Sequence, residues 1–219
     1  MAQQKVRNPL FARVYARLCP AMERGGMAER RQALLADLAG TVVEVGAGSG
    51  ATFAHYPPAV TRVVAVEPEP YLRAQATHAA AEAPVPVKVV DGTAERLPAG
   101  DGVFDGAVVA LVLCSVADVD GALAELRRVL RPGGQLRFLE HVRAEHGYVL
   151  PWVQRALDAT IWPRIGGGCH TCRDTTGALT RAGFTIHRLE RFRYPEGPLV
   201  LPTSPHVSGA ATRAPGDVA

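Results

Sequence analysis

A β-branched segment that stops in a cluster of glycines is the feature that most constrains the fold of this chain. Residues 41–45 (Thr-Val-Val-Glu-Val) have the composition of a buried strand, and residues 46–50 (Gly-Ala-Gly-Ser-Gly) follow directly. Because glycine lacks a Cβ, the backbone of such a loop can approach a ligand closely. We therefore expect a strand, a ligand-binding loop and then a helix.

Strand-like and helical segments alternate along most of the chain. We predict further strands at 62–66, 85–90, 104–113 and 135–140, and helices at 8–18, 27–38, 71–83, 119–130 and 173–183. Continuous apolar strands that alternate with helices indicate a mostly parallel sheet covered on both faces, a doubly wound α/β fold. Two late segments, 184–194 and 206–212, are predicted to form an antiparallel hairpin at one sheet edge. Residues 148–165 show no clear periodicity.

The length of 219 residues favours a single core. We expect an N-terminal helical cap over residues 1–40, the α/β domain over 41–213 and a disordered tail over 214–219. The first helix is amphipathic, and we predict that its Tyr15 closes over a bound ligand as part of a lid. Core packing and contact with a membrane surface are the alternatives for this helix.

Charge and composition exclude several classes of function. The chain has 24 Lys and Arg against 21 Asp and Glu, too small an excess to predict binding to nucleic acid. No apolar run reaches the length of about 18 residues that predicts a membrane span, so we expect a cytoplasmic protein without integral membrane association. The four cysteines are expected to be free thiols. The expected partner is a small molecule, and the oligomeric state stays open.

Two carboxylates flank the glycine loop. Glu44 lies just before it, where a negative charge would repel a pyrophosphate but could bind the amino group of a ligand. Glu67 ends the next strand, about 20 residues further on, where a carboxylate accepts both hydroxyls of a ribose. The loop also fits a nicotinamide-dependent oxidoreductase, but we find no residues typical of a hydride-transfer site. The pair of carboxylates favours a nucleoside that carries an amino acid.

Three further motifs complete a family resemblance. They are 91–98 (Asp-Gly-Thr-Ala-Glu-Arg-Leu-Pro), 103–105 (Val-Phe-Asp) and 130–134 (Leu-Arg-Pro-Gly-Gly). Together with the glycine loop, they resemble the class I S-adenosylmethionine-dependent methyltransferases. The resemblance implies a Rossmann-like fold, S-adenosyl-L-methionine as cofactor, and a loop 91–98 that flanks adenine. Thr93 stands where many members have an aspartate, so adenine binding would depend on backbone groups around it.

A narrower resemblance covers most of the chain from about residue 8 onward. The segments that carry it are 56–58, 111–116, 140–142, 168–173 and 205–209. They resemble the alkyl-thiol methyltransferases, whose animal members carry a membrane anchor, and their bacterial relatives. We do not carry the anchor over. The resemblance implies a small apolar acceptor, with thiol, oxygen or carbon as the target atom in that order. A protein that binds the cofactor without transferring its methyl group is the alternative.

The predicted site has a cofactor end and an acceptor end. The cofactor-binding residues are predicted to be Tyr15, Glu44, Gly46, Ala47, Gly48, Ser49, Gly50, Glu67, Pro68, Gly92, Thr93, Ala94 and Leu111. Open-sheet topology places Cys114, Ser115, Glu140 and His141 near the methyl group. His141 is the candidate general base, because an imidazole accepts a proton near neutral pH; packing at a strand end is the alternative. A single Cys-x-x-Cys at 169–172 does not predict a metal site.

Overall fold

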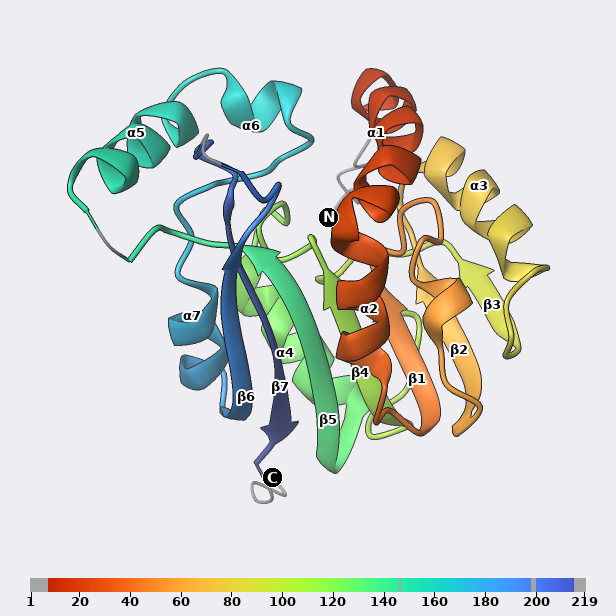
Figure 1. Ribbon diagram of the computed structural model, residues 1–219. Helices are drawn as coiled ribbons and strands as arrows, with labels where there is room; N and C mark the ends of the chain where they lie inside the picture. Colours follow the sequence, from red (N-terminus) through yellow and green to blue (C-terminus); the bar gives the residue numbers. More distant parts are fainter. Residues whose placement is uncertain (1–7, 146, 198–199, 215–219) are drawn as a thin grey trace.

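One seven-stranded sheet organises the molecule. The computed structural model describes residues 8–145, 147–197 and 200–214, and the strand order is β3-β2-β1-β4-β5-β7-β6 (Figure 1). The strands are β1 (Gly40–Val45), β2 (Val60–Val66), β3 (Val87–Val90), β4 (Phe104–Ala110), β5 (Leu130–His141), β6 (Phe184–Arg193) and β7 (Pro205–Arg213). Strands β1 to β5 are parallel to one another. The doubly wound Rossmann-like fold predicted from the sequence is confirmed.

The last two strands run against the rest of the sheet. Strand β7 is inserted between β5 and β6 and pairs antiparallel with both. The predicted C-terminal hairpin at one sheet edge is therefore confirmed. Its register places His206 directly opposite His141, so the final strand reaches the carboxyl end of β5.

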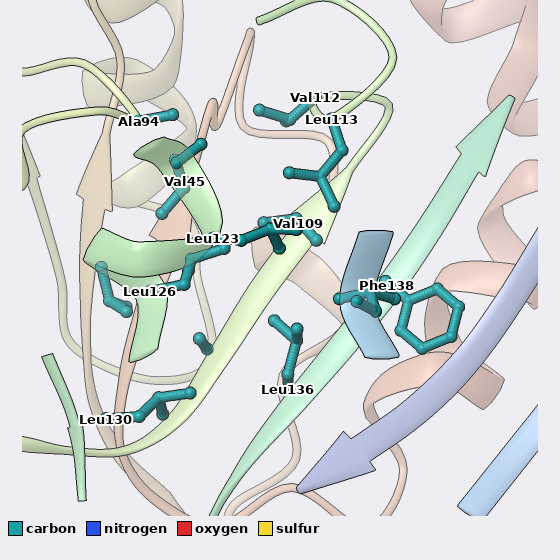
Figure 2. Close-up of a cluster of buried hydrophobic side chains, with 14 of the residues drawn as sticks. Val45, Ala94, Val109, Val112, Leu113, Leu123, Leu126, Leu130, Leu136 and Phe138 are labelled. Atoms are coloured by element: carbon teal, nitrogen blue, oxygen red, sulfur yellow. The ribbon is translucent and has the colours of Figure 1, made fainter. Parts of the chain in front are cut away.

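Helices cover both faces, and each face has its own apolar core. Helices α2 (Ala28–Leu35) and α3 (Pro70–Ala80) pack on one face, and α4 (Val119–Val129) and α7 (Thr175–Arg181) on the other. Successive strand residues point to opposite faces, so Val42 joins the first core while Val43 and Val45 join the second. Figure 2 shows the second core, where Leu123 and Leu126 of α4 pack over the sheet.

Three helices lie beyond the carboxyl ends of the parallel strands (Figure 1). They are α1 (Pro9–Met22), α5 (Val149–Asp158) and α6 (Trp162–Ile165). Helix α1 begins where it was predicted to begin. The Asn8 side chain caps it by accepting the Phe11 N–H at 3.1 Å, and a proline occupies its first turn. A single π-helical turn, η1 (Glu23–Met27), joins α1 to α2. None of the described helices is both long and apolar enough to span a bilayer.

The structure corrects the predicted end of the second helix. Helix α2 ends at Leu35, before the predicted limit of residue 38. Gly40 has a φ of +77°, but it opens β1 instead of capping the helix. A Cβ there would collide with the carboxylate of Asp105, which accepts the Thr41 N–H at 2.7 Å. Gly40 therefore lets the chain enter β1 without a collision with Asp105.

Two helix predictions also need correction. The glycine loop leads only into a single 3-10 turn, η2 (Phe53–His55), because Pro57 and Pro58 cannot continue a helix. The region 148–165, which showed no clear periodicity, contains α5 and α6. Pro151 lies in the first turn of α5, where a missing N–H costs no hydrogen bond. Of the predicted tail, only Ala214 is among the described residues.

Candidate active site

The glycine loop leaves β1 through three left-handed residues. Gly46, Gly48 and Gly50 have φ values of +66°, +57° and +84°, which residues with a Cβ adopt only at a cost. A Cβ at Gly46 would lie 2.5 Å from Cγ2 of Val112, in the loop after β4. One at Gly48 would lie 3.3 Å from Cε1 of Tyr15. The loop is thus closely packed between β4 and the first helix.

Glu67 lies at the end of β2 with its carboxylate against this loop. One oxygen accepts the Gly48 N–H at 2.8 Å, and the other accepts the Glu69 N–H at 2.9 Å. Burial raises the pKa of Glu67 to about 7, although both hydrogen bonds act to lower it. A carboxylate has about four lone-pair positions, so two remain to accept hydroxyl groups. The position fits the predicted contact with a ribose.

Glu44 is buried beneath the loop, at 2% exposure. Its carboxylate accepts the Tyr56 hydroxyl at 2.7 Å. Burial raises the pKa of Glu44, while hydrogen bonds from Tyr56 and Thr52 and the charge of Arg31 act to lower it. The side chain that was predicted to contact a ligand amino group therefore forms its described hydrogen bonds within the protein.

Aromatic residues of α1 connect the glycine loop with the loop before α7. Tyr15 lies against Gly48, and its ring stacks on Phe11 at a centroid distance of 5.8 Å. Phe11 in turn covers Gly167, where a Cβ would lie 2.5 Å from its ring. Asn8 adds a hydrogen bond from its side chain to the Arg164 carbonyl at 3.0 Å. Helix α1 spans the site in the position expected of a lid.

The predicted adenine loop follows β3, beside the end of β2. Gly92 and Ala94 are buried, and Thr93 is half-buried and forms an isolated β-bridge with Arg96. A Cβ at Gly92 would lie 2.9 Å from Cγ1 of Val66, one residue before Glu67. The structure thus places this loop next to the carboxylate. Pro68, the residue after Glu67, is half-buried in the same region.

The loop after β4 is held by Glu140. Leu111 has a φ of +63°, the sole non-glycine residue with positive φ in the described ranges. The Glu140 carboxylate, fully buried on β5, accepts the N–H groups of Val112, Leu113 and Cys114 at 3.0, 2.9 and 3.1 Å. Burial raises the pKa of Glu140, and the three N–H groups act to lower it. Glu140 therefore shapes this strained loop.

Two cysteines and a histidine meet at the acceptor end. One ligand-type atom from each of Cys114, His141 and Cys169 lies within 4.8 Å of the other two. Cys169 Sγ is 3.4 Å from Nδ1 of His141. The side-chain interaction between Cys114 and Cys169 lowers the pKa of Cys169, with help from His141, and raises that of Cys114. All four cysteines of the chain are free thiols, as predicted.

His206 is the neighbour that the sequence did not suggest. Its ring lies 4.5 Å from that of His141, centroid to centroid. Nδ1 contacts the Ser204 carbonyl at 2.8 Å, while Nε2 is buried without a hydrogen-bond partner among the described residues. Burial lowers the pKa of His206 to about 3, so the ring is neutral at physiological pH. The position of His206 follows from the β5–β7 register, which the sequence pattern does not determine.

The Cys-x-x-Cys segment does not act as a unit. The Cys172 thiol points to the Pro151 carbonyl at 3.9 Å, whereas Cys169 turns to Cys114 and His141. The sequence thus predicted that Cys114, Glu140 and His141 lie at one end of the sheet, but it did not predict that Cys169 joins them. A cysteine that follows three consecutive glycines in a loop was the available signal.

Comparison with known proteins identifies the family. A family model described as a methyltransferase domain matches residues 43–138. The human thiol S-methyltransferase TMT1B is 38% identical over 176 residues, which cover 78% of this chain and 70% of that protein. The chain belongs to the S-adenosylmethionine-dependent methyltransferases. Human TMT1A is 34% identical over 181 residues, covering 79% of this methyltransferase and 70% of the relative.

Solved structures share the fold of this methyltransferase. An S-adenosylmethionine-dependent methyltransferase from Thermotoga maritima superposes with a TM-score of 0.64 at 23% identity, over 93% of this chain and 99% of the other. S-adenosyl-L-methionine is the cofactor of the family. The carboxylate of Glu67 and the tightly packed glycine loop fit a ribose-bearing ligand. The nicotinamide-dependent oxidoreductase is not favoured.

Proposed function

We propose that this methyltransferase methylates the sulfur of a small, apolar thiol. The observation that carries the proposal is the meeting of Cys114, His141 and Cys169 at the carboxyl ends of β4 and β5, beyond the glycine loop. The similarity to thiol S-methyltransferases supports the choice of sulfur over oxygen or carbon. A thiol ionises more readily than an alcohol, so it needs little help from the protein.

The proposed cofactor site extends across the carboxyl ends of β1, β2 and β3. S-adenosyl-L-methionine supplies a methyl group on a positively charged sulfur. Glu67 would accept the ribose hydroxyls, the loop 46–50 would approach the amino-acid part, and the backbone around Thr93 would flank adenine. Leu111, in the loop after β4, would contact the cofactor from the same side. Glu44, buried beneath the loop, would interact with the amino group of the cofactor.

The N-terminal segment is proposed to close the site. Tyr15 and Phe11 cover the glycine loop and Gly167, so they would exclude water from both substrates. We therefore propose helix α1, within the predicted cap of residues 1–40, as the part that covers the domain 41–213, while α2 packs on the sheet itself. Water exclusion strengthens the electrostatic interactions between the protein and a charged ligand.

His141 is proposed to promote ionisation of the acceptor. Its ring lies beside Cys169 at the end of β5, on the acceptor side of the site. An imidazole at this place can accept the proton of a bound thiol. We further propose that the enzyme is cytoplasmic, because closely spaced free thiols persist in a reducing compartment. We also propose that it has no nucleic-acid partner, because its excess of basic residues is small.

Turnover of an acceptor panel tests the function. The purified chain is incubated with S-adenosyl-L-methionine and alkyl thiols, phenols, quinols or amines, and S-adenosylhomocysteine and methylated product are measured by mass spectrometry. We expect methyl thioether from alkyl thiols, with one S-adenosylhomocysteine released per product. Turnover of phenols or quinols without turnover of any thiol would refute the assignment of sulfur.

A further inference from the structure

We propose that Cys114, His141 and Cys169 form a binding site for Zn²⁺ whose open fourth position takes the sulfur of the acceptor. The three residues come from the loop after β4, the end of β5 and the loop before α7, so the fold alone brings them together. The inference rests on the proposed thiol methylation, because it assigns the open position to a thiol.

The distances within the cluster match those of a tetrahedral zinc site. Zinc binds thiolate sulfur at about 2.3 Å and imidazole nitrogen at about 2.0–2.1 Å. At a tetrahedral angle, these bond lengths place two sulfurs about 3.8 Å apart and a sulfur and a nitrogen about 3.6 Å apart. The observed distance from Cys169 Sγ to His141 Nδ1 is 3.4 Å, and the three donor atoms lie within 4.8 Å of one another. Little movement is needed to bind the ion.

The donor set also favours zinc. Two thiolates and one imidazole are soft and borderline ligands, which select zinc over magnesium or calcium. A site with three protein ligands keeps a fourth position open, and such open sites are typical of catalytic zinc. A structural zinc site is closed by four protein ligands, so this arrangement points to a substrate-binding ion.

On this proposal, His206 would hold the ring of the zinc-bound His141. A histidine that binds zinc through Nδ1 carries a proton on Nε2, and this N–H is held by an acceptor in most metal sites. Nδ1 of His206 faces the Ser204 carbonyl and so carries the proton of that ring, which leaves Nε2 as an acceptor. That nitrogen is buried without a partner among the described residues, in a ring 4.5 Å from His141.

Zinc would ionise the acceptor directly. Zinc binding would release the thiol protons of Cys114 and Cys169 to solvent. The bond from zinc to the acceptor sulfur would then form as the S–H bond of the acceptor breaks, and that proton would also leave to solvent, so no electron is gained or lost. The sulfur is then a thiolate at neutral pH, next to the cofactor. When zinc is bound, His141 acts as its ligand, and the ion takes over the deprotonation that was assigned above to the free imidazole.

Cobalt is the probe for the site, because a Co²⁺–thiolate bond gives a charge-transfer absorption in the near ultraviolet. Metal-free full-length protein is titrated with Co²⁺ under anaerobic conditions and then with Zn²⁺, which should displace it. We expect one equivalent of Co²⁺ in the wild type and in Cys172→Ser, the matched control three residues away. Cys169→Ser and His141→Ala should each bind Co²⁺ at least tenfold more weakly. Binding of S-adenosylhomocysteine shows that each variant is folded.

Addition of propanethiol to the Co²⁺ protein tests the open position. We expect the charge-transfer band to grow as a further thiolate binds. No Co²⁺ binding by the wild type, equal loss in Cys172→Ser, or a spectrum unchanged by propanethiol would overturn the proposal. Thiol methylation by metal-free protein at the full rate would also overturn it and would leave the proposed function intact. Absence of thiol methylation with and without Zn²⁺ would instead refute the function.

Discussion

Acidification should weaken cofactor binding through Glu67. Burial raises the pKa of this carboxyl to about 7, and the ribose hydroxyls need its ionised form. Below that pH, binding must first remove a proton, so the apparent Kd rises by the factor 1 + 10^(pKa − pH). The factor is about tenfold at about pH 6 and close to one at about pH 8, a difference of about 1.4 kcal/mol. Affinity is thus retained above the pKa and lost below it.

Isothermal titration calorimetry with S-adenosylhomocysteine measures this dependence. Glu67→Gln removes the titrating group and the charged acceptor, so we expect affinity lower by about 1–3 kcal/mol near pH 8 and little further change down to pH 6. Glu82→Gln changes an exposed carboxylate beyond α3 and should follow the wild type. A wild-type affinity that stays constant over this range, or a Glu67→Gln profile as steep as the wild type, would refute the reasoning.

Three substitutions test other parts of the structure. Gly48→Ala places a Cβ at a φ of +57° and 3.3 Å from the Tyr15 ring, so it should cost about 1–2 kcal/mol of stability and weaken cofactor binding, as measured by thermal denaturation and calorimetry. Glu140→Gln turns an amide NH₂ toward backbone N–H groups and should lower stability by about 1–3 kcal/mol, about 2–4 °C in Tm per kcal/mol. Leu123→Ala opens the core under α4 and should cost about 2–5 kcal/mol in urea unfolding. An unchanged midpoint in any of the three would contradict the packing described for that residue.

The sequence pattern was sufficient to predict the five parallel strands of the sheet. Strands β1 and β2 are short β-branched segments with clear ends, so hydrophobic pattern and turn residues agree there. Glu67 could be placed next to the glycine loop because parallel strands end at the same edge. The hydrogen bond from Gly48 to Glu67 follows from that placement.

Other features depended on tertiary contacts that no local pattern encodes. Helix α5 exposes Val149 and Trp152, so its apolar residues did not mark a core-facing side. The partner of Cys169 is set by the path of the loop before α7, whose glycines pack against Phe11 and Ser115. Both features depend on how segments distant in sequence pack together.

The insertion of β7 between β5 and β6 determines when the acceptor end is completed during synthesis. All predicted cofactor residues except Leu111 lie within the first 94 residues, but His206 joins His141 only through a strand that ends at Arg213. A nascent chain that has released the first five strands still lacks this neighbour. Most of the predicted cofactor residues are therefore synthesised first, and the acceptor end is complete only when the last strand pairs with β5.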